Sequence, residues 1–81
     1  MDAVPKSHRM SRVQLVGLLS ESLGDTKATE VVTAAAAQMG LGLIEYDRSQ
    51  TLQILERVAD EPGLVGIVAR FAKARAILAM K

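Results

Sequence analysis

The C-terminal segment of the chain, residues 63–81, is apolar around most of its circumference when it is drawn as a helix. One apolar face consists of Leu64, Ile67, Val68, Phe71, Ala74 and Leu78, and a second consists of Val65, Ala69, Ala72, Ala76 and Ala79. A helix that rests on a core with one side needs an apolar arc of only about 100°. The segment therefore predicts a helix that is covered on more than one side.

Two interpretations explain this double apolar surface. In the first, the other helices of the chain surround the last one, and its Arg and Lys side chains lay their aliphatic stems over the core while their charges stay in water. In the second, the chain covers one face and a second copy or a partner protein covers the alanine-rich face, because two-fold dimers are the commonest assembly. The second interpretation predicts an interface formed by Val65, Ala69, Ala72, Ala76 and Ile77.

The length and composition of the chain indicate one small aliphatic domain. A chain of 81 residues buries only about 60–65% of the surface that its unfolded form exposes, so additional burial against a partner is stabilising. Apolar residues make up 49% of the sequence, but Tyr46 and Phe71 are the only aromatic ones. The predicted core residues are Leu15, Leu19, Val32, Leu55, Val68, Phe71 and Leu78.

Apolar residues recur with a helical period in four segments, which predict helices at residues 12–23, 26–39, 48–60 and 64–80. Short connections between these segments predict that they pack as a compact all-α four-helix bundle, a single helical domain over residues 11–81. Residues 1–10 are polar and contain Pro5, which predicts a flexible basic arm.

Capping residues and glycines mark the expected helix boundaries. In chain order they are Ser11 with Gln14, Gly24, Asp25 or Thr26, Gly40, Asp47 or Ser49 with Gln50, and the turn Pro62-Gly63. Residues 41–46 are predicted to form an extended connector or a short strand, and a strand at this place has no evident partner in the chain. No internal repeat is visible in the sequence.

Charge is distributed unevenly along the chain. The formal net charge is +1, but residues 13–61 contain eight of the nine acids, whereas the C-terminal segment, residues 63–81, contains four cations and no acid. Opposite charges steer the encounter of two proteins and fix their orientation. This pattern favours a pairing in which the basic final helix of one copy faces the acidic middle of another.

Two further features concern the setting of the protein. The longest uncharged run is residues 31–44, and a membrane-spanning helix needs about 20 residues. We therefore expect no transmembrane segment. The chain contains no cysteine, which excludes disulfides and thiolate metal sites and is consistent with a reducing compartment such as the cytoplasm.

Residues that carry chemistry are scarce, and their pattern indicates that the protein is not an enzyme. His8 is the only histidine and lies in the predicted arm, where nothing orients it. Glu56 and Asp60 share one helix face, but no histidine accompanies them. Ser20 and Ser22 have no evident base to activate them. We expect no catalytic, cofactor-binding or metal-binding residues.

Two functions are compatible with these patterns. The favoured one is a non-catalytic module for protein–protein interaction or self-association, of a regulatory or scaffolding kind, which contacts a homodimer partner or another protein through its C-terminal helix. The alternative is a small nucleic-acid-associated protein, whose candidate phosphate contacts are Lys6, Arg9, Arg12, Arg70 and Lys73. The alternative is weaker because the pI is only about 8.2 and the basic segments contain no aromatic platform for bases.

Overall fold

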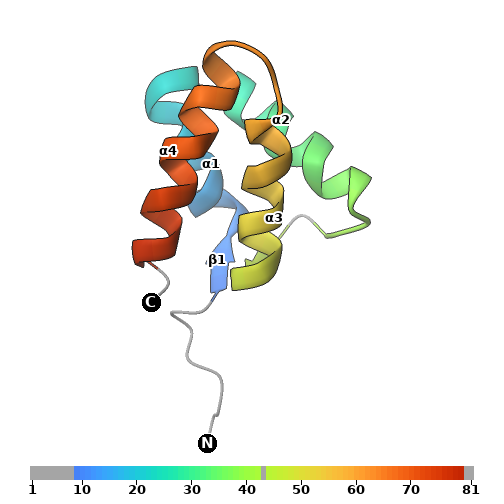
Figure 1. Cartoon of the computed structure of the whole chain (residues 1–81). Coiled ribbons are helices and arrows are strands. Elements are labelled where there is room, and N and C mark those ends of the chain that lie inside the picture. The colour runs from blue at the N-terminus through green and yellow to red at the C-terminus, as the bar shows by residue number, and fades with distance from the viewer. Residues whose placement is uncertain (1–8, 43, 80–81) are drawn as a thin grey trace, which may run out of the picture.

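The computed structural model describes residues 9–42 and 44–79, which fold into a four-helix domain with one small sheet (Figure 1). In chain order the elements are β1 (Arg9–Ser11), α1 (Arg12–Leu23), α2 (Asp25–Gln38), β2 (Glu45–Asp47), α3 (Arg48–Ala59) and α4 (Leu64–Ala79). Every described helix boundary lies within one residue of its predicted position. The prediction of a compact all-α four-helix fold is therefore confirmed.

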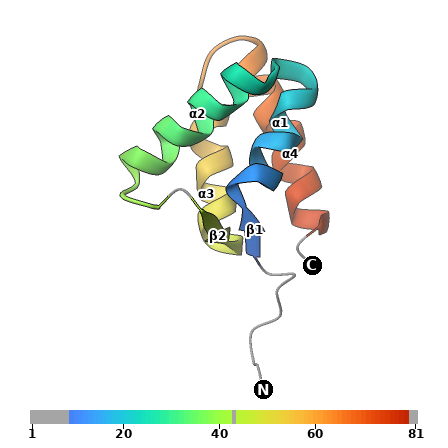
Figure 2. The same cartoon turned by 180° about the vertical axis from the view of Figure 1, so that it is seen from behind.

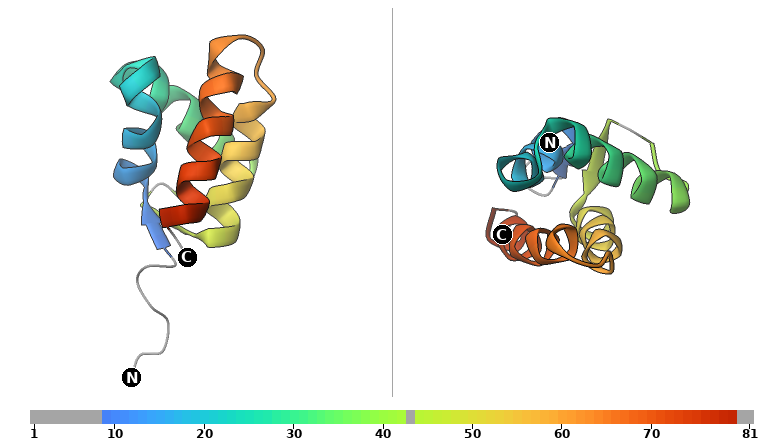
Figure 3. Two further views of the ribbon diagram at one scale, coloured as in Figure 1. Left: turned by 60° about the vertical axis from the view of Figure 1, so that its left-hand side comes forward. Right: turned by 90° about the horizontal axis from the view of Figure 1, so that it is seen from above.

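The helices form two layers. Seen from above, α1 and α2 make one layer, and α3 and α4 make the other (Figure 3). Helix α4 lies along α3 and also contacts α1. The core between the layers consists of Leu15, Leu19, Ala28, Val32, Ala35, Ala36, Ile54, Leu55, Val58, Val68, Ala69, Ala72 and Ala76, and Met10 and Tyr46 complete it from the strands.

The two strands pair antiparallel at one end of the molecule (Figure 2). Met10 lies opposite Tyr46, and both side chains are buried. Beyond the sheet, the amide of Arg12 donates a hydrogen bond to the carbonyl oxygen of Ile44 at 2.8 Å. Sequence reasoning missed this partner for the second strand, because it assigned residues 9 and 10 to the flexible arm. The remainder of that predicted arm, residues 1–8, lies outside the described residues.

Capping boxes begin α1 and α3, as predicted. At α1, the Gln14 amide donates to Ser11 Oγ at 3.1 Å, and the Ser11 amide donates to Gln14 Oε1 at 3.0 Å. At α3, Asp47 and Gln50 exchange the same two bonds at 2.7 and 3.0 Å. Each box satisfies two backbone N–H groups that have no partner within the helix. These local bonds position the helices relative to the strands.

The connection between α1 and α2 is shorter than predicted. Gly24 alone joins the two helices, and its φ of 84° explains why glycine stands there. Helix α2 begins at Asp25, and no side chain caps it, so the predicted cap at Asp25 or Thr26 is wrong. A carboxylate in the first turn still interacts favourably with the helix dipole.

The chain consists of two halves with the same order of elements, β1–α1–α2 and β2–α3–α4. The strand and the first helix of the two halves occupy equivalent positions. Helices α1 and α3 both have 12 residues and follow their strands directly. Equivalent pairs at a constant sequence spacing are Met10 and Tyr46, Ser11 and Asp47, Gln14 and Gln50, and Leu19 and Leu55. The chain therefore builds the same β–α–α order twice. The sequence hides this repeat in part because positions such as Met10 and Tyr46, or Ser11 and Asp47, keep their burial or capping role with a different residue type.

Two hydroxyl groups are buried without a hydrogen-bond partner among the described residues, Tyr46 Oη and Thr51 Oγ1. Tyr46 is 1% exposed and Thr51 is 0% exposed. A buried hydroxyl group that forms no hydrogen bond costs about 1–3 kcal/mol of stability. Burial raises the pKa of the Tyr46 hydroxyl above its usual value, although the nearby Arg12 charge partly offsets the effect.

We expect Tyr46→Phe and Thr51→Val each to raise the free energy of unfolding by about 1 kcal/mol, measured by urea denaturation. Thr33→Val is the matched control, because Thr33 is only half-buried on α2, and it should change stability little. The wild-type stability should also fall as the pH rises above about 10, the ordinary tyrosine pKa, because only the unfolded chain ionises there. Tyr46→Phe should remove that decline. Destabilisation by Thr51→Val would contradict the absence of a partner for its hydroxyl.

Candidate protein-docking face

Helix α4 presents large apolar side chains to solvent. Leu64 is 60% exposed, Ile67 50%, Phe71 69% and Leu78 66%. Together with the exposed Ala74, these residues form one continuous side of the helix, which we call the α4 face. Among the described residues, the other exposed large apolar side chains are Val13 on α1 and Ile44 before β2. The α4 face is therefore the main concentration of apolar surface on the described part of the molecule.

The spacing of the α4 face matches a coiled-coil seam. Its members follow one another at alternating intervals of three and four residues, as the a and d positions of a heptad do. Such a seam lies along one side of a helix and accepts the side chains of a second helix between its own. The geometry therefore suits an elongated helical ligand better than a small molecule.

The three alanines of the predicted interface were expected on the surface, but they lie inside the protein. Ala69 and Ala76 are 0% exposed and Ala72 is 2% exposed, and they face the core of their own chain. The two remaining members of the predicted interface, Val65 and Ile77, are half-buried. The chain's own helices cover these alanines, although the sequence led us to expect a second copy in that place.

Two predicted core residues are correspondingly exposed. Phe71 and Leu78 belong to the α4 face rather than to the core, although Val68 is buried as predicted. The physical reason is the close approach of α4 to its neighbours, which leaves room for alanine and glycine but not for a phenyl ring. At Gly66, a Cβ atom would overlap the carbonyl oxygen of Glu61 and lie 2.8 Å from that of Ala59.

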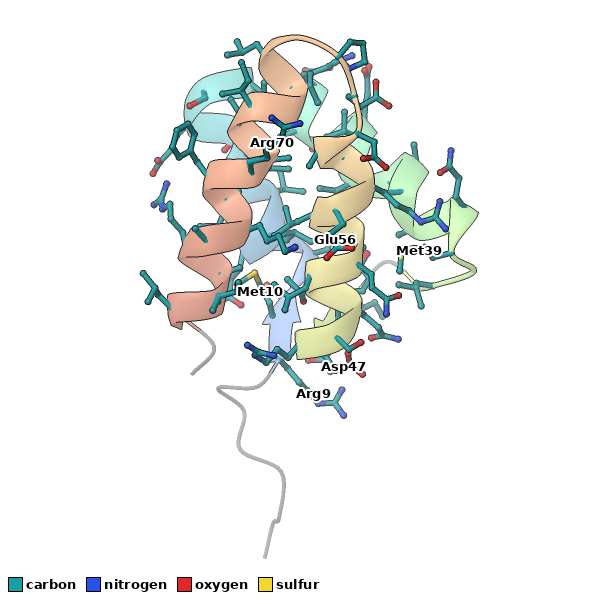
Figure 4. All side chains as sticks on the ribbon, viewed as in Figure 1. Arg9, Met10, Met39, Asp47, Glu56 and Arg70 are labelled. Carbon is teal, nitrogen blue, oxygen red and sulfur yellow. The ribbon has the colours of Figure 1, made fainter. Side chains whose placement is uncertain are left out.

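Ion pairs tie α4 to its neighbours on both sides of the α4 face. Lys73 Nζ lies 2.7 Å from Glu56 Oε2 on α3, and Arg75 Nη1 lies 3.2 Å from Glu21 Oε1 on α1. Arg70 is exposed, and none of the ion pairs among the described residues includes it. Figure 4 shows Arg70 on α4 and Glu56 on the adjacent α3. The basic helix and the acidic middle of the sequence thus attract each other within one chain.

The candidate phosphate contacts do not form one patch. Lys6 lies outside the described residues. Arg9 pairs with Glu45 at 3.8 Å, and Lys73 pairs with Glu56. Arg9 and Arg70 lie far apart along the molecule (Figure 4). Arg12 lies close enough to Tyr46 to influence its hydroxyl pKa. The four described cations are therefore divided between the start of the chain at β1 and α1 and helix α4.

The remaining surface offers little that points to chemistry. The described residues contain no group of three or more His, Cys, Asp and Glu side chains placed to hold a metal ion. A shallow groove of about 230 Å³ between α2 and α3 is lined by charges of both signs, including Lys27, Glu30 and Glu61. Arg57 Nη1 donates to Gln38 Oε1 at 3.4 Å in this groove. Within residues 9–42 and 44–79, no helix is long and apolar enough to cross a bilayer.

In comparisons with known proteins, no protein-family model, curated protein or solved structure matches the chain. The structure defines an all-α domain with one apolar helix face open to solvent.

Sequence reasoning identified the helix but not its exposed residues Leu64, Ile67, Phe71 and Leu78. Side-chain size was the signal that distinguishes the two faces. One side of α4 carries large residues at heptad spacing, and the opposite side carries alanine and Gly66. A side composed of small residues permits close packing within the chain, so the side with the large residues is the one left exposed to solvent.

Proposed function

We propose that this protein is a non-catalytic helical module that binds another protein, either a second copy or a different chain, through the α4 face. The observation that carries the proposal is the exposure of Ile67, Phe71 and Leu78 on one side of a single helix. Contiguous apolar patches of this kind mark interaction sites on soluble proteins. A domain with one docking helix suits a scaffolding or regulatory role, and a chain without cysteine suits the cytoplasm.

Burial of the α4 face supplies the free energy for such an interaction. Transfer of a leucine, isoleucine or phenylalanine side chain from water to a protein interior contributes about 1.5–3 kcal/mol. Large aromatic side chains near the centre of an interface are the commonest residues to dominate its affinity. Phe71 lies in the middle of the seam between Leu64 and Leu78, so it is the expected anchor.

Replacement of Phe71 by Glu tests the proposal. We expect Phe71→Glu to weaken association by at least about 30-fold, because it places a charge at the centre of an apolar contact. Sedimentation velocity over a concentration series measures self-association, and affinity capture with the purified chain as bait measures binding to other proteins. Circular dichroism checks that the variant remains folded.

The matched control is Val13→Glu, since Val13 is 75% exposed on α1 rather than on α4. This variant should associate as the wild type does. The proposal is wrong if Phe71→Glu and the wild type show the same mass in solution and retain the same proteins. It is equally wrong if the wild type remains an 8.7 kDa monomer and retains no protein.

A further inference from the structure

We infer that the occupant of the α4 face is an acidic amphipathic helix of a different protein, not a second copy of this chain. This inference rests on the proposed function, and it specifies the chemistry of the partner. Three properties of the described residues lead to it: the shape of the seam, the charges beside it and the chain's lack of a complementary helix.

The shape of the seam selects a helix. Helix α4 has 16 residues, which at a rise of about 1.5 Å per residue gives a seam about 24 Å long. Leu64, Phe71 and Leu78 fall on a positions, and Ile67 and Ala74 fall on d positions. The small Ala74 leaves a gap between larger neighbours, into which one large side chain of a facing helix fits.

The charges beside the seam select acidic flanks on that helix. Arg70 and Arg75 occupy the g and e positions that border an a/d seam, where partner choice in coiled coils is decided. Arg75 already forms an ion pair with Glu21. Arg70 is not part of any ion pair among the described residues. Glutamates beside the apolar stripe of a partner helix would meet both guanidinium groups.

A second copy of the chain does not provide this complement. Its α4 has the same apolar seam, but residues 64–81 contain no acid, so two α4 helices bring like charges together. Glu21 and Glu56 of the middle segment are engaged with Arg75 and Lys73 of their own chain. None of the other described helices exposes a stripe of large apolar residues. Two pairs between the basic helix and the acidic middle, which the sequence favoured between copies, are thus made inside each chain.

The first half of the molecule shows that the fold does not require an apolar exterior on its second helix. Helix α2 follows α1 as α4 follows α3. No large apolar side chain of α2 is exposed, and its exposed residues include Lys27, Glu30 and Gln38. The apolar residues of the α4 face are therefore not a general consequence of this architecture.

Two designed peptides test the inference. Both are amphipathic helices about three heptads long with leucine at a and d, one with glutamate and the other with lysine at e and g. Neither pairs well with itself, because its flanks carry charge of one sign. Titration into the isotope-labelled protein, followed by NMR shifts of backbone amides, measures affinity and locates the site.

We expect the acidic peptide to shift α4 amides and to bind at least about tenfold more tightly than the basic peptide at low salt. The difference should shrink at about 1 M salt, where the screening length falls to about 3 Å. Arg70→Glu should weaken acidic-peptide binding about fivefold. The matched control, Arg48→Glu, reverses an exposed cation on α3 and should bind as the wild type does.

The unfavourable outcomes separate the two proposals. Equal binding of both peptides to α4 would overturn the acidic partner and leave the docking face intact. Self-association that Phe71→Glu abolishes would also overturn it, since a second copy would then be the occupant. If neither peptide binds, the inference fails, and the Phe71→Glu association experiment decides the docking face separately.

Discussion

Replacement of Gly66 by Ala is expected to lower the free energy of unfolding by about 1–3 kcal/mol. In the interior of an ordinary helix the same change stabilises by about 1 kcal/mol, so the sign is reversed here. The reason is steric: the added Cβ would overlap the Glu61 carbonyl oxygen and crowd that of Ala59. Both obstacles are backbone atoms, one at the end of α3 and one in the α3–α4 connection, and they cannot rotate away as a side chain can.

Gly17 provides the matched control for this prediction. It lies within α1, and an added Cβ would meet no atom within 4 Å. Gly17→Ala should therefore raise the free energy of unfolding by about 0.5–1 kcal/mol, the usual gain for removing a helical glycine. Urea denaturation of both variants measures the contrast. A Gly66→Ala protein as stable as Gly17→Ala would show that α4 does not approach the α3–α4 connection as closely as described.

Leu19→Ala and Phe71→Ala are expected to differ strongly, although both remove large apolar side chains. Leu19 is 0% exposed, so its truncation leaves a cavity and should cost about 2–5 kcal/mol. Phe71 is 69% exposed, so its truncation should change the stability of the isolated chain by less than about 0.5 kcal/mol. Denaturation at low protein concentration, where association does not contribute, measures both values.

This comparison decides which side of α4 faces inward. A buried phenylalanine truncated to alanine costs about 3–5 kcal/mol, so an equal loss for the two variants would place Phe71 in the core. The expectation from the sequence that Phe71 is a core residue would then be correct. A small loss for Phe71→Ala combined with a large loss for Leu19→Ala agrees with the described packing and leaves Phe71 available to a partner.

The helices were predictable because their signals are local. The capping pairs Ser11–Gln14 and Asp47–Gln50 act within a single turn, and both form as expected. Gly40 and Gly63 have positive φ at the points where helices stop or turn, which glycine tolerates better than other residues. A spacing of three to four residues between apolar positions then indicates a helix, and no contact distant in the sequence has to be known.

The strand pair and the orientation of α4 were not predictable in the same way. The segment Arg9–Ser11 has no strong strand preference, and its pairing with Glu45–Asp47 depends on a partner distant in sequence. Both faces of α4 are apolar, so hydrophobicity alone does not select the inward one. The selection depends on the distance between helix backbones, which is a property of the assembled core.

Helix α4 places its smallest side chains inward and its largest outward. Folding of the single chain therefore dehydrates the alanines and leaves the water around Phe71 and Leu78 in place. Because these two side chains stay hydrated, their burial does not contribute to the heat-capacity change of folding. Their burial against a partner would give complex formation a negative heat-capacity change of its own.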